Sequence, residues 1–235
     1  MDKFISVILP TYNEKENIIA LLQAIHCQLE SRPHEIIVID DQSPDGTYQA
    51  VCDLCDKRVK AILRTANPGL ARSIARGLKE ASGNIVLVMD SDFDHDPKYI
   101  PFMVNAIAQY DCVCASRFLP GGKMNGCLHS LGSRVFNLFI RLTTASSLTD
   151  HLYGYFLIKR EALEQCPLEK IFFGYGDYYI RLLYYLEKNN IPIFQFPAIN
   201  GGRVRPKKAG FVKIFWQYVI AVVRLPQISP MKSHV

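Results

Sequence analysis

The stretch IVLVMDSDFDHDP, residues 85–97, decides the fold class of this chain. Its first five residues are apolar and rich in β-branched side chains, so we expect a strand that is buried on both faces. Asp90 and Asp92 follow where this strand ends, and Pro97 opens a helical stretch that runs to about residue 109. A buried strand that leads through an acidic turn into a helix is typical of α/β proteins.

The same unit recurs along the first half of the chain. Apolar runs predict further strands at residues 5–9, 35–39, 60–63 and 112–115, and helices are expected at residues 18–29, 47–56 and 69–81. Asn13 and Glu16 have the spacing of a capping box ahead of the first of these helices. Buried strands separated by helices predict one α/β domain, residues 1–210, with a Rossmann-like, mostly parallel sheet flanked by helices.

Composition limits the class of protein. The chain has 235 residues, of which 49% are hydrophobic, and it carries 27 Lys and Arg against 22 Asp and Glu. A chain of this size and balance can bury a large core, which excludes intrinsic disorder, and its basic excess is too small for a generic nucleic-acid binder. The excess is concentrated in residues 200–235, which contain seven Lys or Arg and no acid. That bias needs a local explanation.

Cysteine usage and hydropathy favour the cytoplasm. Cys52 and Cys55 form a CxxC pair, but no second pair or clustered histidine supplies the other ligands of a zinc site. Without a signal peptide, we expect the seven cysteines to be reduced thiols. No run of 18 apolar residues is present, so no membrane-spanning helix is expected.

Acidic residues follow three of the expected strands. Glu14 comes after the first strand, Asp41 after the second, and Asp90, Asp92 and Asp94 after the fourth. Ligands bind where the carboxyl ends of parallel strands meet, so these acids favour a cation-dependent site over unrelated loop acids. Two carboxylates in a D-x-D turn can hold one Mg²⁺ or Mn²⁺ together with substrate phosphates. The D-x-D of aspartyl-phosphate phosphatases is a weaker alternative, because it usually follows the first strand and precedes Thr or Val.

Five segments together resemble a known family. They are VILPTYNEKENI (7–18), IIVIDDQSPDGT (36–47), GLARSIARGLKEASG (69–83), VMDSDFDHDP (88–97) and ASRF (115–118). In order and spacing they are similar to family 2 glycosyltransferases, and most of all to the dolichol- or polyprenyl-phosphate mannosyltransferases. The resemblance implies the GT-A fold, a nucleotide-sugar donor and Mg²⁺ or Mn²⁺ as cofactor.

The resemblance also implies roles for individual residues on the donor side. Four residues would hold the base and ribose: Pro10, Tyr12, Glu14 and Asp41. Asp90, Ser91 and Asp92 would hold the metal and the diphosphate, with Asp92 counted among the catalytic residues. Asp94 stands where the family often has Gln, so it either adds a third metal carboxylate or repels the diphosphate.

On the acceptor side, the implied catalytic residues are Arg117, Ser133, Arg134 and Arg205, with Lys208 as a further donor-binding residue. These residues would bind and align phosphate groups, for which Arg is well suited. The chain departs from the family pattern at four positions: His129 for Arg, His151 for Pro, Tyr153 for Ser and Pro206 for Gly. The acceptor or its binding geometry is therefore expected to differ from the usual one in the family.

Two amphipathic segments, residues 131–142 and 211–225, are candidates for membrane contact. The second lies in the acid-free tail and is rich in aromatics, which suits a helix at a membrane surface. Packing against the sheet is the alternative, and for residues 131–142 both interpretations stay open. Residues 211–235 are thus predicted to be a basic amphipathic C-terminal segment that packs on the domain or lies at the membrane surface.

These inferences predict an enzyme. It would transfer a hexose, with inversion and a divalent metal, from a donor of the GDP-mannose or UDP-glucose type to a polyprenyl or dolichyl phosphate. A phosphomonoester, whose second pKa is about 6, is largely ionised near neutral pH, so no strong general base is needed. We expect a peripheral protein at the cytoplasmic face of a membrane, with a membrane-anchored subunit as a candidate partner and no nucleic acid.

Two alternatives stay open. The first is a glycosyltransferase of the same fold that acts on a soluble glycan or a protein, with Asp177 recruited as the base. The second is a catalytically silent module that binds a nucleotide or a lipid.

Overall fold

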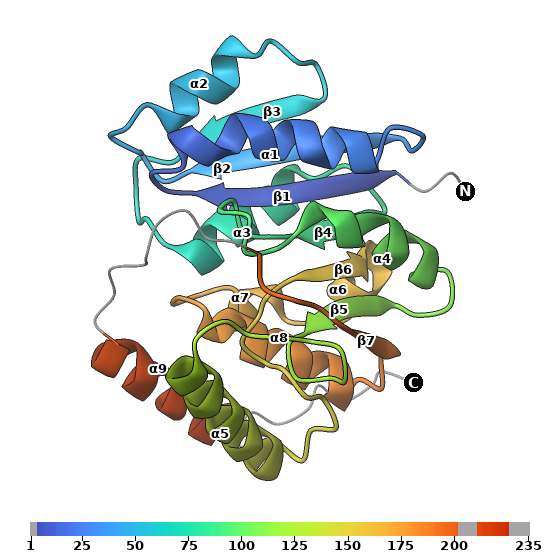
Figure 1. Cartoon of the computed structure of the whole chain (residues 1–235), viewed down its shortest axis with the longest axis vertical. Coiled ribbons are helices and arrows are strands. Elements are labelled where there is room, and N and C mark those ends of the chain that lie inside the picture. The colour runs from blue at the N-terminus through green and yellow to red at the C-terminus, as the bar shows by residue number, and fades with distance from the viewer. Residues whose placement is uncertain (1–3, 202–210, 226–235) are drawn as a thin grey trace.

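The computed structural model describes residues 4–201 and 211–225, and one seven-stranded sheet organises that part of the chain (Figure 1). The strands are β1 (Ile5–Thr11), β2 (His34–Asp40), β3 (Val59–Leu63), β4 (Ile85–Val88), β5 (Cys112–Ser116), β6 (Phe156–Lys159) and β7 (Ile193–Pro197). Their order across the sheet is β3-β2-β1-β4-β6-β5-β7. In this sheet β6 runs antiparallel to both β4 and β5, and the other pairs are parallel. The mostly parallel α/β arrangement is confirmed, and β6 and β7 are additions to the predicted strands.

Helices cover both faces of the sheet. They are α1 (Lys15–Gln28), α2 (Thr47–Asp53), α3 (Leu70–Glu80), the 3₁₀ helix η1 (Pro97–Tyr99), α4 (Ile100–Ala106), α5 (Cys127–Thr144), α6 (Arg160–Glu164), α7 (Leu168–Ile171), α8 (Asp177–Lys188) and α9 (Phe211–Arg224). Val7 and Leu9 of β1 belong to the core formed with α1 and α4, whereas Ile8 belongs to the core formed with α3 and α8. Successive strand residues face opposite ways, so β1 supplies both cores and is buried throughout.

The amino end of α1 joins two neighbouring loops. The predicted capping box is wrong, because the N-cap residue is Glu14 and no side chain caps the helix. The N–H groups of residues 13–15 instead donate to three side chains of the β2–α2 loop: Ser43 Oγ (2.9 Å), Thr47 Oγ1 (3.0 Å) and Asp45 Oδ2 (3.1 Å). The loops that follow β1 and β2 therefore form one hydrogen-bonded unit.

Pro10 lies inside β1, although the sequence predicted that it would end the strand. β1 pairs with β4 only as far as Ile8 opposite Val88, whereas it pairs with β2 as far as Thr11. The Ile8 carbonyl accepts the N–H of Met89, so Ile8 and Pro10, two residues further on, both face β4. The missing N–H of Pro10 therefore lies past the end of β4, where it costs no ladder hydrogen bond.

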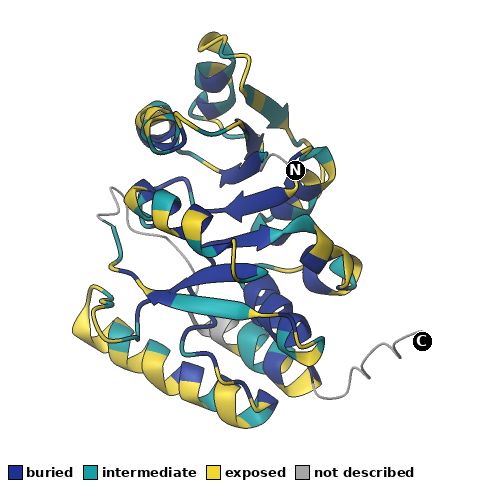
Figure 2. Cartoon of the chain, turned by 90° about the vertical axis from the view of Figure 1, so that its right-hand side faces the viewer, coloured by how far each residue is buried: buried dark blue, intermediate teal, exposed yellow. Residues whose placement is uncertain are grey.

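At the foot of the molecule, α9 packs against α8 and α5 (Figure 1). Val222 and Leu225 are buried there, and the ring of Tyr218 lies 6.3 Å from that of Phe136 in α5. Helix α5 is longer than the predicted stretch, and Figure 2 shows that much of it is exposed. Among the residues that the structure describes, no helix has both the length and the apolar character needed to cross a bilayer.

Candidate active site at the carboxyl ends of the strands

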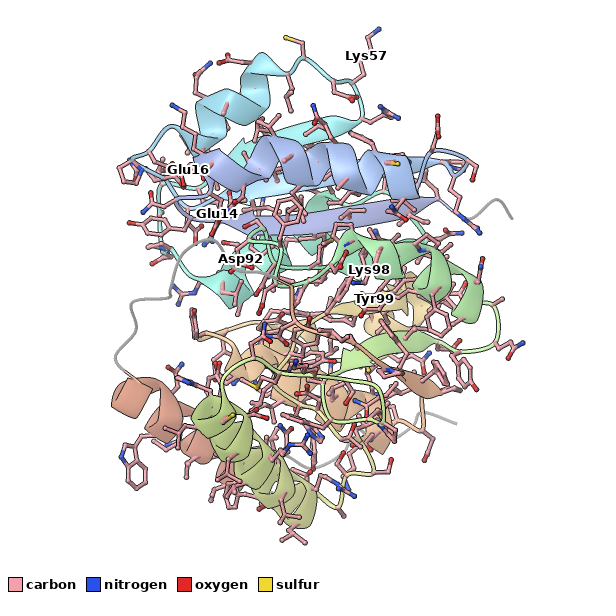
Figure 3. All side chains as sticks on the ribbon, in the orientation of Figure 1. Glu14, Glu16, Lys57, Asp92, Lys98 and Tyr99 are labelled. Atoms are coloured by element: carbon pink, nitrogen blue, oxygen red, sulfur yellow. The ribbon has the colours of Figure 1, made fainter. Side chains whose placement is uncertain are left out.

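The acids predicted to form a site lie at one edge of the sheet. β2, β1 and β4 are parallel neighbours, so their carboxyl ends meet, and Glu14 and Asp92 lie on that side of the molecule (Figure 3). Ser91 donates its hydroxyl to the carbonyl of Pro10 at 3.0 Å, which joins the D-x-D turn to the end of β1. Tyr12 is 59% exposed, so its ring is accessible at this edge.

Asp40 and Asp41, at the end of β2, have their oxygens engaged within the protein. Asp40 is fully buried and accepts hydrogen bonds from the hydroxyl of Thr11 and from the N–H and hydroxyl of Ser43. Three groups donate to Asp41: Arg64 Nη1 (2.6 Å), Ser73 Oγ (2.9 Å) and the N–H of Gly69 (2.7 Å). Asp41 therefore holds the segment 64–69 beside the expected nucleotide position, and its predicted contact with the donor stays a prediction.

His95 braces the D-x-D turn. The N–H of Asp90 donates to His95 Nδ1 at 2.8 Å, so Nδ1 is the acceptor nitrogen and the ring hydrogen is on Nε2. Nε2 in turn donates to the carbonyl of Tyr153 at 2.8 Å, and the imidazole stacks on Tyr155 with 4.8 Å between ring centroids. His95 is 1% exposed. It thus hydrogen-bonds within the turn and links the turn to the segment before β6.

A backbone hydrogen bond joins two of the predicted metal residues, Asp92 and Asp94, in this turn. Asp92 is 7% exposed, and its Oδ1 accepts the N–H of Asp94 at 3.2 Å. Asp94 Oδ1 accepts Asn200 Nδ2 at 3.1 Å, and the Tyr153 hydroxyl donates to the Asp94 carbonyl at 2.8 Å. Burial, together with the negative charges of Asp94 and Asp90, raises the pKa of the Tyr153 phenol. The carboxylates of Asp90 and Asp94 are therefore both near the Tyr153 side chain.

These carboxylates fit a cation that arrives with a nucleotide. Across residues 4–201 and 211–225, no three His, Cys, Asp or Glu side chains converge as the ligands of one metal ion. Mg²⁺ and Mn²⁺ prefer oxygen ligands, and Mg²⁺ is usually bound through one or two carboxylates, with water and substrate phosphates as the remaining ligands. Asp90 and Asp92 supply the carboxylates that such a site needs.

Arg117 forms a buried ion pair with Asp150. Arg117 Nε lies 2.8 Å from Asp150 Oδ2 and Nη2 lies 3.0 Å from Oδ1, and the backbone N–H of Arg117 donates to Oδ2 as well. Burial lowers the pKa of the guanidinium, but the charge and hydrogen bonds of Asp150, together with Tyr153 and the charge of Asp94, outweigh burial and leave the pKa raised. The guanidinium carbon also lies 4.8 Å from the ring of Tyr153. Arg117 is thus held beside the turn, with two of its five guanidinium N–H groups donated to Asp150.

The other predicted phosphate-binding residues lie on α5 or outside the described residues. The Arg134 guanidinium carbon is 4.8 Å from the ring of Phe118, and that of Arg117 is 5.4 Å from the same ring. Ser133 Oγ is buried without a hydrogen-bond partner in the described part of the chain. Arg205 and Lys208 belong to the segment 202–210, which is not described.

Asp177, the alternative base, is also paired. It is 3% exposed, its Oδ2 lies 2.5 Å from Arg181 Nη1, and its Oδ1 accepts the N–H of Tyr175 at 2.8 Å. Both carboxylate oxygens of Asp177 are therefore already engaged by groups of the protein. The loop before it touches α9, because a Cβ on Gly176 would lie 2.0 Å from the Tyr218 hydroxyl.

Sequence reasoning missed the partners that hold these residues. Asp150 for Arg117, Asn200 for Asp94 and Arg64 for Asp41 are each more than 20 positions away along the chain. Asp150 was the one available signal for the partner of Arg117, because a buried Arg requires a carboxylate nearby.

Comparisons with known proteins identify the family of the chain. Residues 6–166 match the family described as Glycosyl transferase family 2. The chain is 33% identical over 228 residues, 94% of its length and 63% of the relative's, to the dolichol-phosphate mannosyltransferase of Pyrococcus furiosus. It is 31% identical over 155 residues, 63% of its length and 46% of the relative's, to the undecaprenyl-phosphate 4-deoxy-4-formamido-L-arabinose transferase of Pectobacterium carotovorum. The chain thus spans less than two thirds of the length of these relatives.

A solved structure shows the same architecture. The glucosyl-3-phosphoglycerate synthase of Mycobacterium tuberculosis, in complex with Mn²⁺, UDP and phosphoglyceric acid, superimposes with a TM-score of 0.73. It is 22% identical and covers 97% of this chain and 80% of its own. At that identity the likeness concerns the fold alone, and it confirms the expected GT-A architecture.

Proposed function

The chain belongs to glycosyl transferase family 2, and from that premise we propose that it transfers a hexose from a nucleotide-sugar to the phosphate of a polyprenyl or dolichyl phosphate, with inversion and a divalent cation. Support comes from the similarity to a dolichol-phosphate and an undecaprenyl-phosphate transferase. The observation that carries the choice of acceptor is the ion pair between Asp177 and Arg181. A hydroxyl acceptor needs a free base, whereas a phosphate acceptor does not.

On the donor side, the residues present suit a nucleotide diphosphate. Tyr12 offers an exposed ring, Glu14 lies at the same strand end, and Asp41 holds the neighbouring segment 64–69. A Mg²⁺ or Mn²⁺ bound by Asp90 and Asp92, with Asp94 beside them, would neutralise the charge that builds on the leaving diphosphate. His95 and Ser91 keep this turn in place through their bonds to Tyr153 and Pro10.

On the acceptor side, positioning is the main contribution of the protein. The phosphate oxygen that attacks is already ionised near neutral pH, so Arg117, Ser133 and Arg134 need only bind and orient it. Arg205 and Lys208 are proposed to assist. Inversion follows from a single in-line displacement at the sugar carbon.

Peripheral attachment to the cytoplasmic face of a membrane is part of the proposal. The outward side chains Leu128, Leu138 and Leu142 of α5 are exposed, as are Trp216 and Ile220 of α9. Neither helix contains Asp or Glu. Exposed apolar side chains on helices with only basic charges suit an anionic membrane surface, or a membrane-anchored partner subunit that covers them.

The test is nucleotide release from a panel of GDP- and UDP-sugars with Mn²⁺, each with and without a short-chain polyprenyl phosphate. We expect one donor to turn over only with the lipid phosphate, and EDTA to stop the reaction. Asp92→Asn abolishes turnover in an enzyme, whereas Asp53→Asn, an exposed acid on α2, is the matched control and leaves it unchanged. Release that depends on a soluble glycan, or no release with any donor, contradicts the proposal and favours one of the two alternatives.

A further inference from the structure

Tyr153 stands at one of the positions where the chain departs from the family pattern, which has serine there. It lies in the segment just before β6 and is 5% exposed. Its long side chain carries an aromatic ring with a hydroxyl group at the tip, whereas a serine side chain ends at its γ oxygen. Tyrosine can therefore make contacts here that the usual residue of the family cannot make.

Tyr153 holds the D-x-D turn at both ends. Its hydroxyl donates to the backbone carbonyl of Asp94 at 2.8 Å. Its own carbonyl accepts His95 Nε2 at 2.8 Å, and its ring meets the imidazole edge to face, with 4.6 Å between centroids and 84° between planes. His95 in turn accepts the N–H of Asp90. One buried residue thus restrains the positions on either side of Asp92. A binding loop that is fixed before its ligand arrives binds more tightly, because less freedom is lost on binding.

The ring of Tyr153 also faces Arg117. The guanidinium carbon lies 4.8 Å from the ring centroid, within the range of a cation–π contact. Asp150 accepts hydrogen bonds from Nε and Nη2 of the same guanidinium. Arg117 is thus held by a carboxylate and by an aromatic ring, and a ligand can use only the N–H groups that Asp150 leaves. Burial strengthens the contact with the ring, since the cation there is largely desolvated.

We propose that Tyr153 is a positioning residue that joins the D-x-D turn to Arg117, and so fixes the cation–nucleotide position relative to the residue that orients the acceptor phosphate. The inference rests on the proposed function and deepens it. The hydroxyl acts on the turn through Asp94, and the ring acts on Arg117. Tyr153 works through these residues and does not itself bind the reacting groups. A serine supplies neither the ring nor the reach, so this link is a property of this chain.

The first experiment removes the hydroxyl and keeps the ring. Tyr153→Phe is expected to weaken binding of Mn²⁺ with UDP or GDP about three- to tenfold, as loss of one hydrogen bond does, when measured by titration calorimetry without acceptor. The KM for a short-chain polyprenyl phosphate is expected to stay unchanged, because the ring still faces Arg117.

Tyr155→Phe is the matched control. Tyr155 is also buried, and its hydroxyl donates to the backbone carbonyl of Asp96 at 3.1 Å, beyond the D-x-D turn. The phenylalanine ring can still stack on His95 as the tyrosine ring does. This variant loses the same kind of hydrogen bond, so its Tm is expected to fall like that of Tyr153→Phe, but its affinity for Mn²⁺ with nucleotide is expected to equal that of wild type.

The second experiment removes the ring as well. Tyr153→Leu keeps an apolar side chain in the core but has no aromatic face for Arg117. We expect its affinity for Mn²⁺ with nucleotide to match that of Tyr153→Phe, and its KM for the polyprenyl phosphate to rise several-fold above that of Tyr153→Phe. A merely structural role would lower Tm without separating these two constants. Circular dichroism shows that each variant is folded.

The outcomes distinguish this inference from the proposed function. If Tyr153→Phe binds Mn²⁺ with nucleotide as wild type does, or if Tyr155→Phe loses as much affinity, Tyr153 does not position the turn. If Tyr153→Leu and Tyr153→Phe share one KM for the lipid phosphate, the ring does not position Arg117. If wild type transfers no sugar to the lipid phosphate, the proposed acceptor is wrong, and the calorimetry still decides whether Tyr153 positions the turn.

Discussion

The donor side and the acceptor side of the site are built in different ways. On the donor side, largely buried side chains hydrogen-bond to the backbone of distant segments, as Asp41 does with Gly69 and His95 with Tyr153. On the acceptor side, Arg134 is exposed and its guanidinium lies over the ring of Phe118. Under the proposed function, a nucleotide would meet a prebuilt cradle, whereas the acceptor would meet an open surface. Changes on the first side are expected to cost stability, and changes on the second mainly binding.

The largest effect on stability is expected where the two sides join, at Asp150. Asp150→Ala leaves the buried guanidinium of Arg117 without its partner, which costs about 3–5 kcal/mol of unfolding free energy. Urea unfolding at pH 7 measures it. Asp111→Ala, which breaks a half-exposed pair with Lys159, is the control and costs about 1 kcal/mol or less. Equal losses in the two variants would mean that Asp150 does not neutralise a buried charge.

Low pH is expected to reduce the unfolding free energy through His151, which follows Asp150 and stands where the family has proline. Burial and the charge of Arg141 lower the pKa of His151 to about 4, although Asp150 opposes this. The unfolded chain binds a proton near pH 6.5 and the folded chain only near pH 4, so this stabilisation is complete above pH 6.5 and falls as the pH drops toward 4. The loss by pH 4 is about 3 kcal/mol.

His151→Gln removes that titration while its side-chain amide can still bond to Ser146 and Asn137, the present partners of the imidazole. Unfolding free energies at pH 7, 5.5 and 4 compare the variant with wild type. The variant is expected to lose less stability over this range. Parallel curves would show that other groups carry the acid dependence.

A smaller effect is expected at Gly201, which touches the carboxylate turn. A Cβ there would lie 1.7 Å from the carbonyl oxygen of Phe93, and the Gly201 N–H donates to the backbone carbonyl of Asp94. Gly201→Ala therefore has to displace the turn, at a cost of about 1–3 kcal/mol and with weaker binding of Mn²⁺–nucleotide. Thermal unfolding and calorimetry measure the two effects.

Gly132→Ala provides the control for that variant. Gly132 lies on α5 with open space around it, so alanine there raises helix propensity and stabilises by up to about 1 kcal/mol. If Gly201→Ala behaves like Gly132→Ala, the turn is not packed as the structure describes.

The smallest effect on stability is expected from a substitution among the exposed apolar side chains of α5. Leu138→Ser changes the unfolding free energy by about 0.5 kcal/mol or less, because the side chain is 52% exposed. Its binding to vesicles with anionic lipids is nevertheless expected to fall several-fold, as measured by co-sedimentation. Tyr110→Ser, a partly buried aromatic change on the sheet side, should show the reverse pattern, with lower stability and unchanged vesicle binding. Unchanged vesicle binding of Leu138→Ser would remove α5 from the membrane surface.

Much of the donor side could be predicted from the sequence, because its signals are local. Apolar runs followed by acids located the ends of β1, β2 and β4, and the parallel arrangement brought those ends together. The local signal failed at Asn13 and Glu16, where the expected capping box is replaced by bonds to the β2–α2 loop. A loop about 30 residues away competes with a local cap, and residue spacing does not reveal that competition.

What the sequence determined by itself was the α/β class, the position of the acidic turn and membership of a glycosyltransferase family. Each depends on patterns within about 20 neighbouring residues, namely hydrophobic periodicity and motif order. Tertiary structure alone decided that Arg117 is paired with Asp150, that Asp177 is paired with Arg181, and that apolar side chains of α5 such as Leu138 stay exposed. These features depend on which distant side chains meet and which are left exposed, and that is settled only when the core is packed.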